Sequence, residues 1–373
     1  MKLAGHNRAT ARPQHISRRR GERMTLTASI AALVVGIAAP AASASRREPP
    51  PPPPPTATYS ITDLGNLGFQ ATFATGINNN GQVTGRSGTP KTVEGSCSLR
   101  FRPCPTHVYN AFLWSAGTMS NLGTLGGNYS EGTAINDLGE VVGSSQTKSG
   151  SEAFLFRNGK MTGIGSFSPA AINESDVVAG SMSIPGEGHT DAVLWQNGRI
   201  TDLGLLPGEG GIFTDASGIN KTNEVAGSGD NRESMERAWV WRNGTMTDIG
   251  TLGGPQAAAY AINNAGQIVG FAQTSTDADH GYVFAGGKMT DLGLNIFPYA
   301  INNNGVIVGT GGCGSAIIIS GGACQNLQNL IPAGSGYTLM EAKGINDKGQ
   351  IIAYAQLQTD PGHPVHAVLL APS

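Results

Sequence analysis

Seven copies of one short pattern divide this chain, and that repeat constrains the fold more than any other feature. Each copy has a small residue, then Ile-Asn, a few polar residues and an apolar run that usually ends in Gly. The seven asparagines are Asn78, Asn136, Asn173, Asn220, Asn263, Asn302 and Asn346. Their spacings are 58, 37, 47, 43, 39 and 44 residues. All but the first are close to the period of about 40–50 residues that is typical of a four-stranded propeller blade.

A second pattern alternates with the first and has two apolar runs separated by a tight turn. Its copies cover residues 111–123, 153–165, 192–204, 238–250 and 281–293, with a degenerate copy at 315–330. Three of these turns are Asn-Gly, at Asn158, Asn197 and Asn243. Asn-Gly between apolar runs is the strongest short signal for a β-hairpin, because a type I′ turn needs positive φ at both central residues. Two hairpins per repeat predict four strands per repeat.

The two ends of the repeat region complete each other. Residues 59–65 match the last strand of the repeat, and residues 366–370 match the third strand, so together they form the missing seventh hairpin. A ring gains from sharing one blade between its termini, because the shared blade closes the ring and removes exposed strand edges. We therefore predict an all-β fold, a seven-bladed β-propeller of four-stranded antiparallel blades closed by pairing of 59–65 with 366–370. An open β-solenoid is the alternative.

The N-terminal 58 residues have the features of an export signal and a linker. A basic stretch that includes Arg18 and Arg23 precedes an apolar run at 28–39, and Ala42-Ser43-Ala44 has the pattern of a signal-peptidase site. We expect a signal peptide at 1–44, a Pro-rich linker at 45–58 and the propeller at 59–373. The proline run at 49–55 predicts a stiff, extended spacer. We expect no transmembrane segment after cleavage and a bacterial protein secreted to the periplasm or beyond.

Charge and cysteine content narrow the possible partners. Removal of residues 1–44 takes away seven basic residues and one acidic residue, which leaves 17 basic and 25 acidic side chains and a net charge of −8. That balance argues against a nucleic-acid partner, which would need a basic surface. The four cysteines fall into two local pairs, Cys97 with Cys104 and Cys313 with Cys324. In an exported chain such pairs predict disulfides. Neither has the spacing of a metal site, so we expect no metal and no cofactor.

The repeat resembles that of the bacterial extracellular HAF family, which is named for a His-Ala-Phe tripeptide followed by Met-x-Asp-Leu-Gly and Leu-Gly-Gly. The matching segments are Asn110-Ala111-Phe112, Glu152-Ala153-Phe154, Asp191-Ala192-Val193 and His366-Ala367-Val368, with Leu-Gly-Gly at 125–127 and 252–254. The resemblance covers roughly residues 59–370. The histidine is interpreted as retained only in the last copy. The resemblance implies an exported repeat protein and no particular activity.

The loops predict where function lies. In such a blade, the connections between the second and third strands, and those between consecutive blades, lie at one end, which we call the variable-loop face. The short hairpin turns lie at the other end, the turn face. Variable loops on a rigid frame usually carry binding. The longest is an insertion between Arg86 and Val108 that contains Cys97 and Cys104. The candidate ligand-binding residues on this face are Arg100, Phe101, Arg102, Tyr129, Glu131, Glu209, Asp215 and Tyr260.

Residues that recur in every repeat are interpreted as structural. The aspartates Asp63, Asp202, Asp248 and Asp291 are replaced by Asn121 and Gly163 in other copies, which favours a role in turn bonding. The repeat asparagines are expected to cap their own turns.

No catalytic motif is evident: the sequence lacks a GxSxG nucleophile elbow, an HExxH helix and a phosphate-binding loop. We predict no catalytic residues and favour a non-catalytic binding or adhesion module that recognises a glycan or an extracellular protein. A polysaccharide hydrolase or lyase, and a structural envelope or matrix component, are the alternatives.

Overall fold

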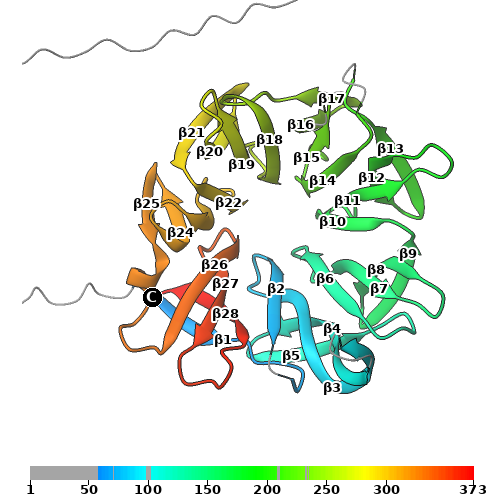
Figure 1. Cartoon of the computed structure of the whole chain (residues 1–373), viewed down its shortest axis with the longest axis vertical. Helices are drawn as coiled ribbons and strands as arrows, with labels where there is room; N and C mark the ends of the chain where they lie inside the picture. The colour runs from blue at the N-terminus through cyan, green and yellow to red at the C-terminus, as the bar shows by residue number, and fades with distance from the viewer. Residues whose placement is uncertain (1–57, 70, 98–101, 208–210, 232, 234) are drawn as a thin grey trace, which may run out of the picture. The chain divides into compact units, whose positions relative to one another are not determined.

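The computed structural model describes residues 58–373, except residues 70, 98–101, 208–210, 232 and 234. The predicted signal peptide and most of the predicted linker lie outside the described residues. Seven four-stranded antiparallel sheets stand around a common axis, as Figure 1 shows. The predicted fold class is confirmed.

In every blade the strands follow one another from the axis of the propeller to its rim. Blade 1 contains β2 (Thr72–Ile77), β3 (Val83–Cys97), β4 (Arg102–Ser115) and β5 (Thr118–Gly123), from the innermost strand to the outermost. Blade 2 contains β6 (Ser130–Ile135), β7 (Val141–Gln146), β8 (Ser151–Arg157) and β9 (Lys160–Gly165). Blade 3 contains β10 (Ser168–Ile172), β11 (Val178–Ser183), β12 (Thr190–Gln196) and β13 (Arg199–Gly204).

The remaining blades follow the same order. Blade 4 contains β14 (Thr214–Ile219), β15 (Val225–Asp230), β16 (Glu236–Arg242) and β17 (Thr245–Asp248). Blade 5 contains β18 (Gly253–Ile262), β19 (Ile268–Thr274), β20 (Asp279–Ala285) and β21 (Lys288–Leu294). Blade 6 contains β22 (Ile296–Ile301), β23 (Ile307–Gly311), β24 (Gly314–Ser320) and β25 (Ala323–Asn326). Blade 7 contains β26 (Tyr337–Ile345), β27 (Ile351–Leu357), β28 (Val365–Pro372) and β1 (Tyr59–Asp63).

Blade 7 is shared between the two ends of the chain, as predicted. β1 pairs antiparallel with β28, with Tyr59 opposite Pro372 and Asp63 opposite Val368. The backbone N–H of Leu64 also donates to the carbonyl of Ala367 at 3.0 Å. This pairing gives β28 a partner on its outer edge, so the ring does not end on an open strand.

The predicted hairpin turns also have the expected backbone. Asn158, Asn197 and Asn243 have φ of about 50°, and a glycine with positive φ follows each of them. In the Ile-Asn hairpins, Gly305 has φ of 76° and its N–H donates to the carbonyl of Asn302. Positive φ at these positions explains why Asn and Gly recur in the turns.

The repeat asparagines form a closed ring of hydrogen bonds around the axis. Each Nδ2 donates to the backbone carbonyl of the equivalent asparagine in the next blade, at 2.8–3.3 Å, and the series ends with Asn346 on Asn78. Each Oδ1 accepts backbone N–H groups of its own turn, as at Asn78, where those of Asn80 and Gln82 donate at 3.0 and 2.9 Å. The predicted turn-capping role is confirmed, and the inter-blade donor role is an addition to it.

The recurring aspartates of the outermost strands bond the turn that follows. In Asp63, Asp202, Asp248 and Asp291, Oδ1 accepts the N–H of the glycine two residues on, at 2.7–2.8 Å. In four blades, the residue just before the small residue of the third strand contacts the side chain at this position of the outermost strand. Those pairs are Asn110 with Asn121, Arg237 with Asp248, His280 with Asp291 and His366 with Asp63.

That arrangement corrects one sequence interpretation. His280 precedes Gly281, which lies opposite Gly293 just as Ala111 lies opposite Gly123. His280 is therefore a second copy of the histidine that the sequence pattern placed only at His366. The small residue after it is glycine in this blade, which obscured the match.

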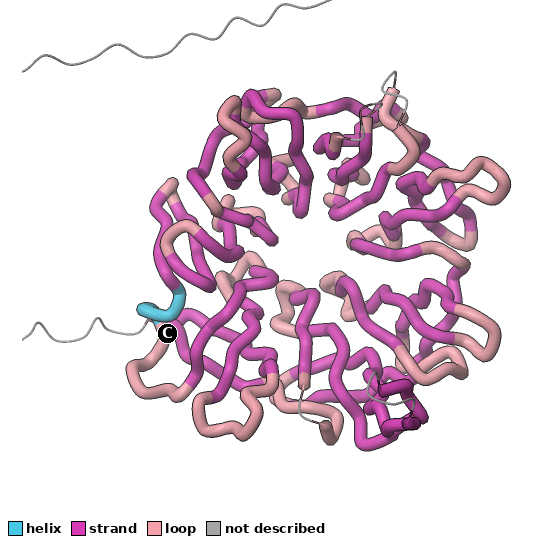
Figure 2. Tube along the Cα trace, viewed as in Figure 1, coloured by secondary structure: helices cyan, strands magenta, loops and turns pink. Residues whose placement is uncertain are grey.

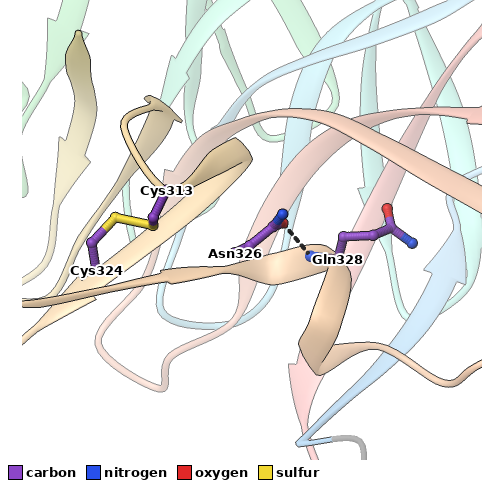
Figure 3. The surroundings of a disulfide bond; sticks show 4 residues. All are labelled: Cys313, Cys324, Asn326 and Gln328. Carbon is purple, nitrogen blue, oxygen red and sulfur yellow. Dashed lines mark hydrogen bonds between the residues drawn. A yellow bond between two sulfur atoms is a disulfide. The ribbon is translucent and has the colours of Figure 1, made fainter. Parts of the chain in front are cut away.

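The structure describes one of the two predicted disulfides. Cys313 and Cys324 form a disulfide, as predicted, with a Cα–Cα distance of 6.1 Å between β24's leading turn and β25 (Figure 3). Asn326 then caps the short 3-10 helix η1 (Leu327–Leu330) by accepting the N–H of Gln328 at 2.9 Å. The side chains of Cys97 and Cys104 lie outside the described part, so that bridge stays a prediction. The segment that contains them extends β3 and β4 as a paired ribbon and is not the loop expected between Arg86 and Val108.

Helix is confined to η1 in the part of the chain that Figure 2 colours by secondary structure. Within residues 58–373 as described, no helix has the length and apolar character needed to cross a membrane.

Candidate functional site

A β-bulge occurs at the same place in all seven innermost strands. The extra residue is always the third before the repeat asparagine, where the register between the innermost and second strands shifts by one. Bulges re-aim a side chain and are over-represented next to functional sites. The seven extra residues, which we call the bulge ring, are Thr75, Thr133, Ala170, Ser217, Tyr260, Tyr299 and Lys343.

The bulge explains the glycine that ends the apolar run of the second strand. A Cβ at Gly143 would collide with the backbone carbonyl of Glu131, and one at Gly270 would collide with that of Ala258. Blade 7 has Ala353 at this position, and its innermost strand carries a second bulge between Leu339 and Glu341.

The bulge ring is chemically asymmetric. Every member is partly exposed. Blades 1 to 4 contribute small or hydroxyl side chains, whereas blades 5 to 7 contribute Tyr260, Tyr299 and Lys343. The ring therefore has a large, aromatic and cationic side and a small, hydroxylated side.

Around the large side, aromatic rings touch from blade to blade. Tyr260 lies 6.0 Å from both Phe271 and Tyr299, measured between ring centroids. Phe271 lies 6.3 Å from Phe297. We call the full set the aromatic arc; its members are Tyr260, Phe271, Phe297, Tyr299, Tyr354, Phe73 and Tyr109.

The arc continues through a lysine into blade 1. The Lys343 ammonium lies 4.0 Å from the ring centroid of Tyr299 and 5.5 Å from that of Tyr354, and it is 3.3 Å from Glu341. Tyr354 meets Phe73 edge-on at 5.7 Å. A cation over a ring face is attracted by the ring quadrupole, so Lys343 holds the two tyrosines in fixed relation.

An ion pair joins the arc to blade 2. The Arg86 guanidinium lies 4.6 Å from the Phe73 centroid, and its Nη1 donates to Glu131 at 2.7 Å. Tyr129 Oη donates to the same carboxylate at 2.6 Å. Two strong donors on one carboxylate fix its position and offset its charge.

The pKa values in this cluster reflect that pairing. Burial raises the pKa of Tyr129 to about 12, and its hydrogen bond to Glu131 acts in the same direction. Burial alone would lower the pKa of Arg86, but the hydrogen bond and charge of Glu131 outweigh burial and raise the pKa of the guanidinium. The cluster is therefore a stable ion pair with a neutral phenol at ordinary pH.

Blade 4 adds a carboxylate with different surroundings. Burial, and then the charge of Asp215, raise the pKa of Glu236, while a hydrogen bond with Ser228 lowers it. The charge of Glu236 in turn adds to burial in raising the pKa of Tyr260 to about 12. Blade 4 thus places an acidic pair beside the end of the aromatic arc.

The candidate residues from the sequence divide into four groups. Tyr129 and Glu131 contact each other, and Tyr260 belongs to the bulge ring on the opposite side. Asp215 is exposed on β14. Arg100, Phe101 and Glu209 lie outside the described residues, as does the side chain of Arg102, which begins β4.

Sequence reasoning missed the residues that link these candidates: Phe73, Arg86, Phe271, Tyr299, Lys343 and Tyr354. A signal for two of them, Tyr299 and Lys343, was available. The residue three before each repeat asparagine varies between copies, although the residue after it is always Gly or Ala. Variation inside an otherwise uniform pattern marks a position that the scaffold leaves open.

The turn face has its own polar pocket, of about 210 Å³, around the asparagine ring. Its charged side chains are engaged within the ring: Asp137 Oδ1 accepts the N–H of Asn79 at 2.7 Å, and Asp347 Oδ1 accepts that of Asn303 at 2.8 Å. These contacts repeat between blades and stabilise the closed ring. In the described ranges, no group of three or more His, Cys, Asp or Glu side chains is placed to hold a metal ion.

Comparisons with known proteins support the fold. No protein family and no curated protein matches the sequence. The β-propeller domain of the Trilobed protease from Pyrococcus furiosus is 10% identical over 81% of this chain and 94% of its own, with a TM-score of 0.50. That propeller is described as having an open velcro topology, whereas in this protein β1 and β28 pair.

Two weaker likenesses involve other propellers. The BP39L lectin from Burkholderia pseudomallei is 11% identical over 83% of this chain and 99% of its own, with a TM-score of 0.39. TolB from Acinetobacter baumannii is 13% identical over 71% of this chain, with a TM-score of 0.40, and this chain spans 60% of its length. The comparisons establish a propeller, and the HAF assignment remains a resemblance.

Proposed function

We propose that this protein is an exported, non-catalytic binding protein that holds a polysaccharide chain across its variable-loop face. The observation that carries the proposal is the aromatic arc, which runs from blade 5 to blade 1, is bridged by Lys343 between Tyr299 and Tyr354, and ends beside the Arg86–Glu131 pair. Partly exposed aromatic rings offer flat apolar surfaces that match the C–H faces of sugar rings. Neighbouring charged groups fix orientation by hydrogen bonding to hydroxyls.

Non-catalytic binding is favoured because the charged groups of the arc are already paired. Glu131 is bonded by Arg86 and Tyr129, and Glu341 lies 3.3 Å from Lys343. A glycosidase needs one carboxylic acid and one free carboxylate flanking the scissile bond. Paired carboxylates are poor candidates for either role.

Export is supported by the predicted signal peptide and by the Cys313–Cys324 disulfide. Disulfides persist in oxidising compartments such as the periplasm and the extracellular space.

Variants on the two sides of the bulge ring test the proposal. Tyr299→Ala removes the arc member that contacts both Tyr260 and Lys343, and we expect it to weaken retention on a bound polysaccharide about tenfold, or about 1.4 kcal/mol. Thr133→Ala, at the equivalent position on the small side, is the matched control and is expected to bind like wild type. Equal retention by both variants would contradict a role for the arc.

A further inference from the structure

The connection between blades 2 and 3 is one of the two shortest in the described ring; only the connection between blades 5 and 6, the single residue Asn295, is shorter. β9 ends at Gly165 and β10 begins at Ser168, so two residues join the blades. Between blades 1 and 2 the connection is six residues long and contains the Leu-Gly-Gly segment 125–127.

The longer connection covers the end of the next blade's second strand. The N–H of Gly127 donates to the carbonyl of Gln146 at 3.0 Å, and the N–H of Leu125 donates to Ser145 Oγ at 2.9 Å. In blade 3 the residue equivalent to Ser145 is Met182, which has no hydroxyl to hold such a segment. The two-residue connection is also too short to supply one, so the end of β11 lacks this cover.

A pocket of about 400 Å³ occupies the place that the missing segment leaves open. It lies between blades 2 and 3 on the variable-loop face. Its lining, which we call the serine pocket, consists of Ser144, Ser151, Glu152, Ser166, Phe167, Ser168, Ser181, Met182 and Ser183.

Most of the lining consists of serines whose hydroxyl groups make no hydrogen bond to another described protein group. Among the described residues, only one of the six serines makes a side-chain hydrogen bond to protein, Ser183 to Thr190 at 3.3 Å. Glu152 adds a carboxylate acceptor. Phe167, which is 7% exposed, and the half-buried Met182 supply an apolar surface.

The side chains that line the serine pocket indicate the class of ligand that it would bind. Serine hydroxyls both donate and accept hydrogen bonds, as sugar hydroxyls do. Within the described part of the chain, no Lys, Arg or His lines the pocket to attract an anion. Small-molecule sites typically have about 300–1,000 Å³, so the volume suits one or two hexose rings.

We propose that the serine pocket binds a neutral hexose unit of a saccharide chain, with the ring over Phe167 and Met182 and its hydroxyls on the serines and Glu152. The proposal deepens the proposed function and rests on it for the choice of a polysaccharide ligand. The serine pocket adds a second contact for the same ligand, on the hydroxylated side of the bulge ring.

A matched pair of filling variants tests the pocket. Ser181→Phe places in blade 3 the aromatic residue that blade 5 has at the equivalent position, Phe271, so we expect the variant to fold. Thr310→Phe makes the same change in blade 6, away from the serine pocket. Glu152→Gln keeps the shape and removes the charge.

Binding of lactose, cellobiose and maltose is measured one at a time by calorimetry with the oxidised protein, at up to about 50 mM sugar. We expect at least one disaccharide to bind wild type and Thr310→Phe equally, to bind Ser181→Phe at least tenfold more weakly, and to bind Glu152→Gln several-fold more weakly. No binding to wild type, or equal binding to Ser181→Phe and wild type, would overturn the pocket.

The two proposals fail in different ways. If Tyr299→Ala lowers polysaccharide retention while no disaccharide binds, the serine pocket is wrong and the aromatic arc stands. If Ser181→Phe loses disaccharide binding while Tyr299→Ala changes nothing, the pocket stands and the arc is wrong.

Discussion

Asn346 Nδ2 donates to the backbone carbonyl of Asn78 at 2.9 Å, which joins the last blade to the first at the axis of the propeller. The two residues are 268 positions apart. The bond completes a ring in which every blade holds the next through the same atom pair. Closure at the axis is therefore distinct from closure at the rim, where β1 pairs with β28.

Asn346→Asp tests the axial closure. The aspartate keeps the Oδ1 that accepts from Lys348 and Gln350, but in place of the donor it turns a second carboxylate oxygen toward the Asn78 carbonyl, which then accepts only the N–H of Gly81. A buried polar group left unsatisfied costs about 1–3 kcal/mol. We expect the free energy of unfolding in urea to fall by that amount. Asn197→Asp, in an exposed turn, is the control and is expected to change the urea midpoint little. Equal urea midpoints for wild type, Asn346→Asp and Asn197→Asp would refute the axial role.

Deletion of residues 59–65 tests closure at the rim. It removes β1, exposes the outer edge of β28, and removes Asp63 from its contacts with His366 at 2.7 Å and Tyr337 at 2.9 Å. We expect a sharp drop in the midpoint of thermal unfolding, measured by calorimetry. A melting curve that matches the intact protein would show that blade 7 does not need its fourth strand.

Alkaline titration tests the burial of the tyrosines. Burial, aided by nearby carboxylates, raises the pKa of each of Tyr129, Tyr260, Tyr337 and Tyr354 to about 12. A raised pKa favours the neutral phenol in the folded state. The resulting stability is fully present below pH 10, the ordinary tyrosine value, and is lost as the pH rises through about 12.

The measurement is phenolate absorbance near pH 11 with and without denaturant. We expect a minority of the eight tyrosines to ionise in the folded protein and most of them in the unfolded chain. Ionisation of all eight at pH 11 while the protein stays folded would show that the tyrosines of the arc are open to solvent.

Loss of the Cys313–Cys324 bridge tests its contribution to stability. The cysteines are 11 residues apart, and closing a loop of that length contributes about 3 kcal/mol in the chain-entropy treatment. We expect the double variant Cys313→Ser, Cys324→Ser to lose about that much in urea unfolding. An unchanged midpoint would mean that blade 6 is fixed by packing alone.

The sequence predicts the strands and turns of the propeller well, because the same pattern is repeated in each blade. The turns at Asn158 and Asn197, the capping side of the repeat asparagines and the shared seventh blade all follow from local chemistry or from how the repeat is divided. Those inferences need only neighbouring residues or the two chain ends.

The contacts between side chains of neighbouring blades could not be predicted from the sequence, because they depend on how close those blades lie. Tyr299 and Lys343 are 44 residues apart and belong to different repeats, and each looks like an ordinary strand residue by itself. The serine pocket arises from a missing segment after Gly165, and its residues come from two blades. His280 was missed for a simpler reason, since glycine replaces the alanine that marks its motif.

The central claim is that the variable-loop face binds polysaccharide without cleaving it. The most direct measurement incubates the purified, oxidised protein with a panel of bacterial and plant polysaccharides and follows both retention of the protein and release of new reducing ends. We predict retention on at least one polysaccharide and no release. Release of new ends would contradict the claim and make Asp215 and Glu236 the first carboxylates to substitute, and absence of retention across the panel would contradict glycan binding itself.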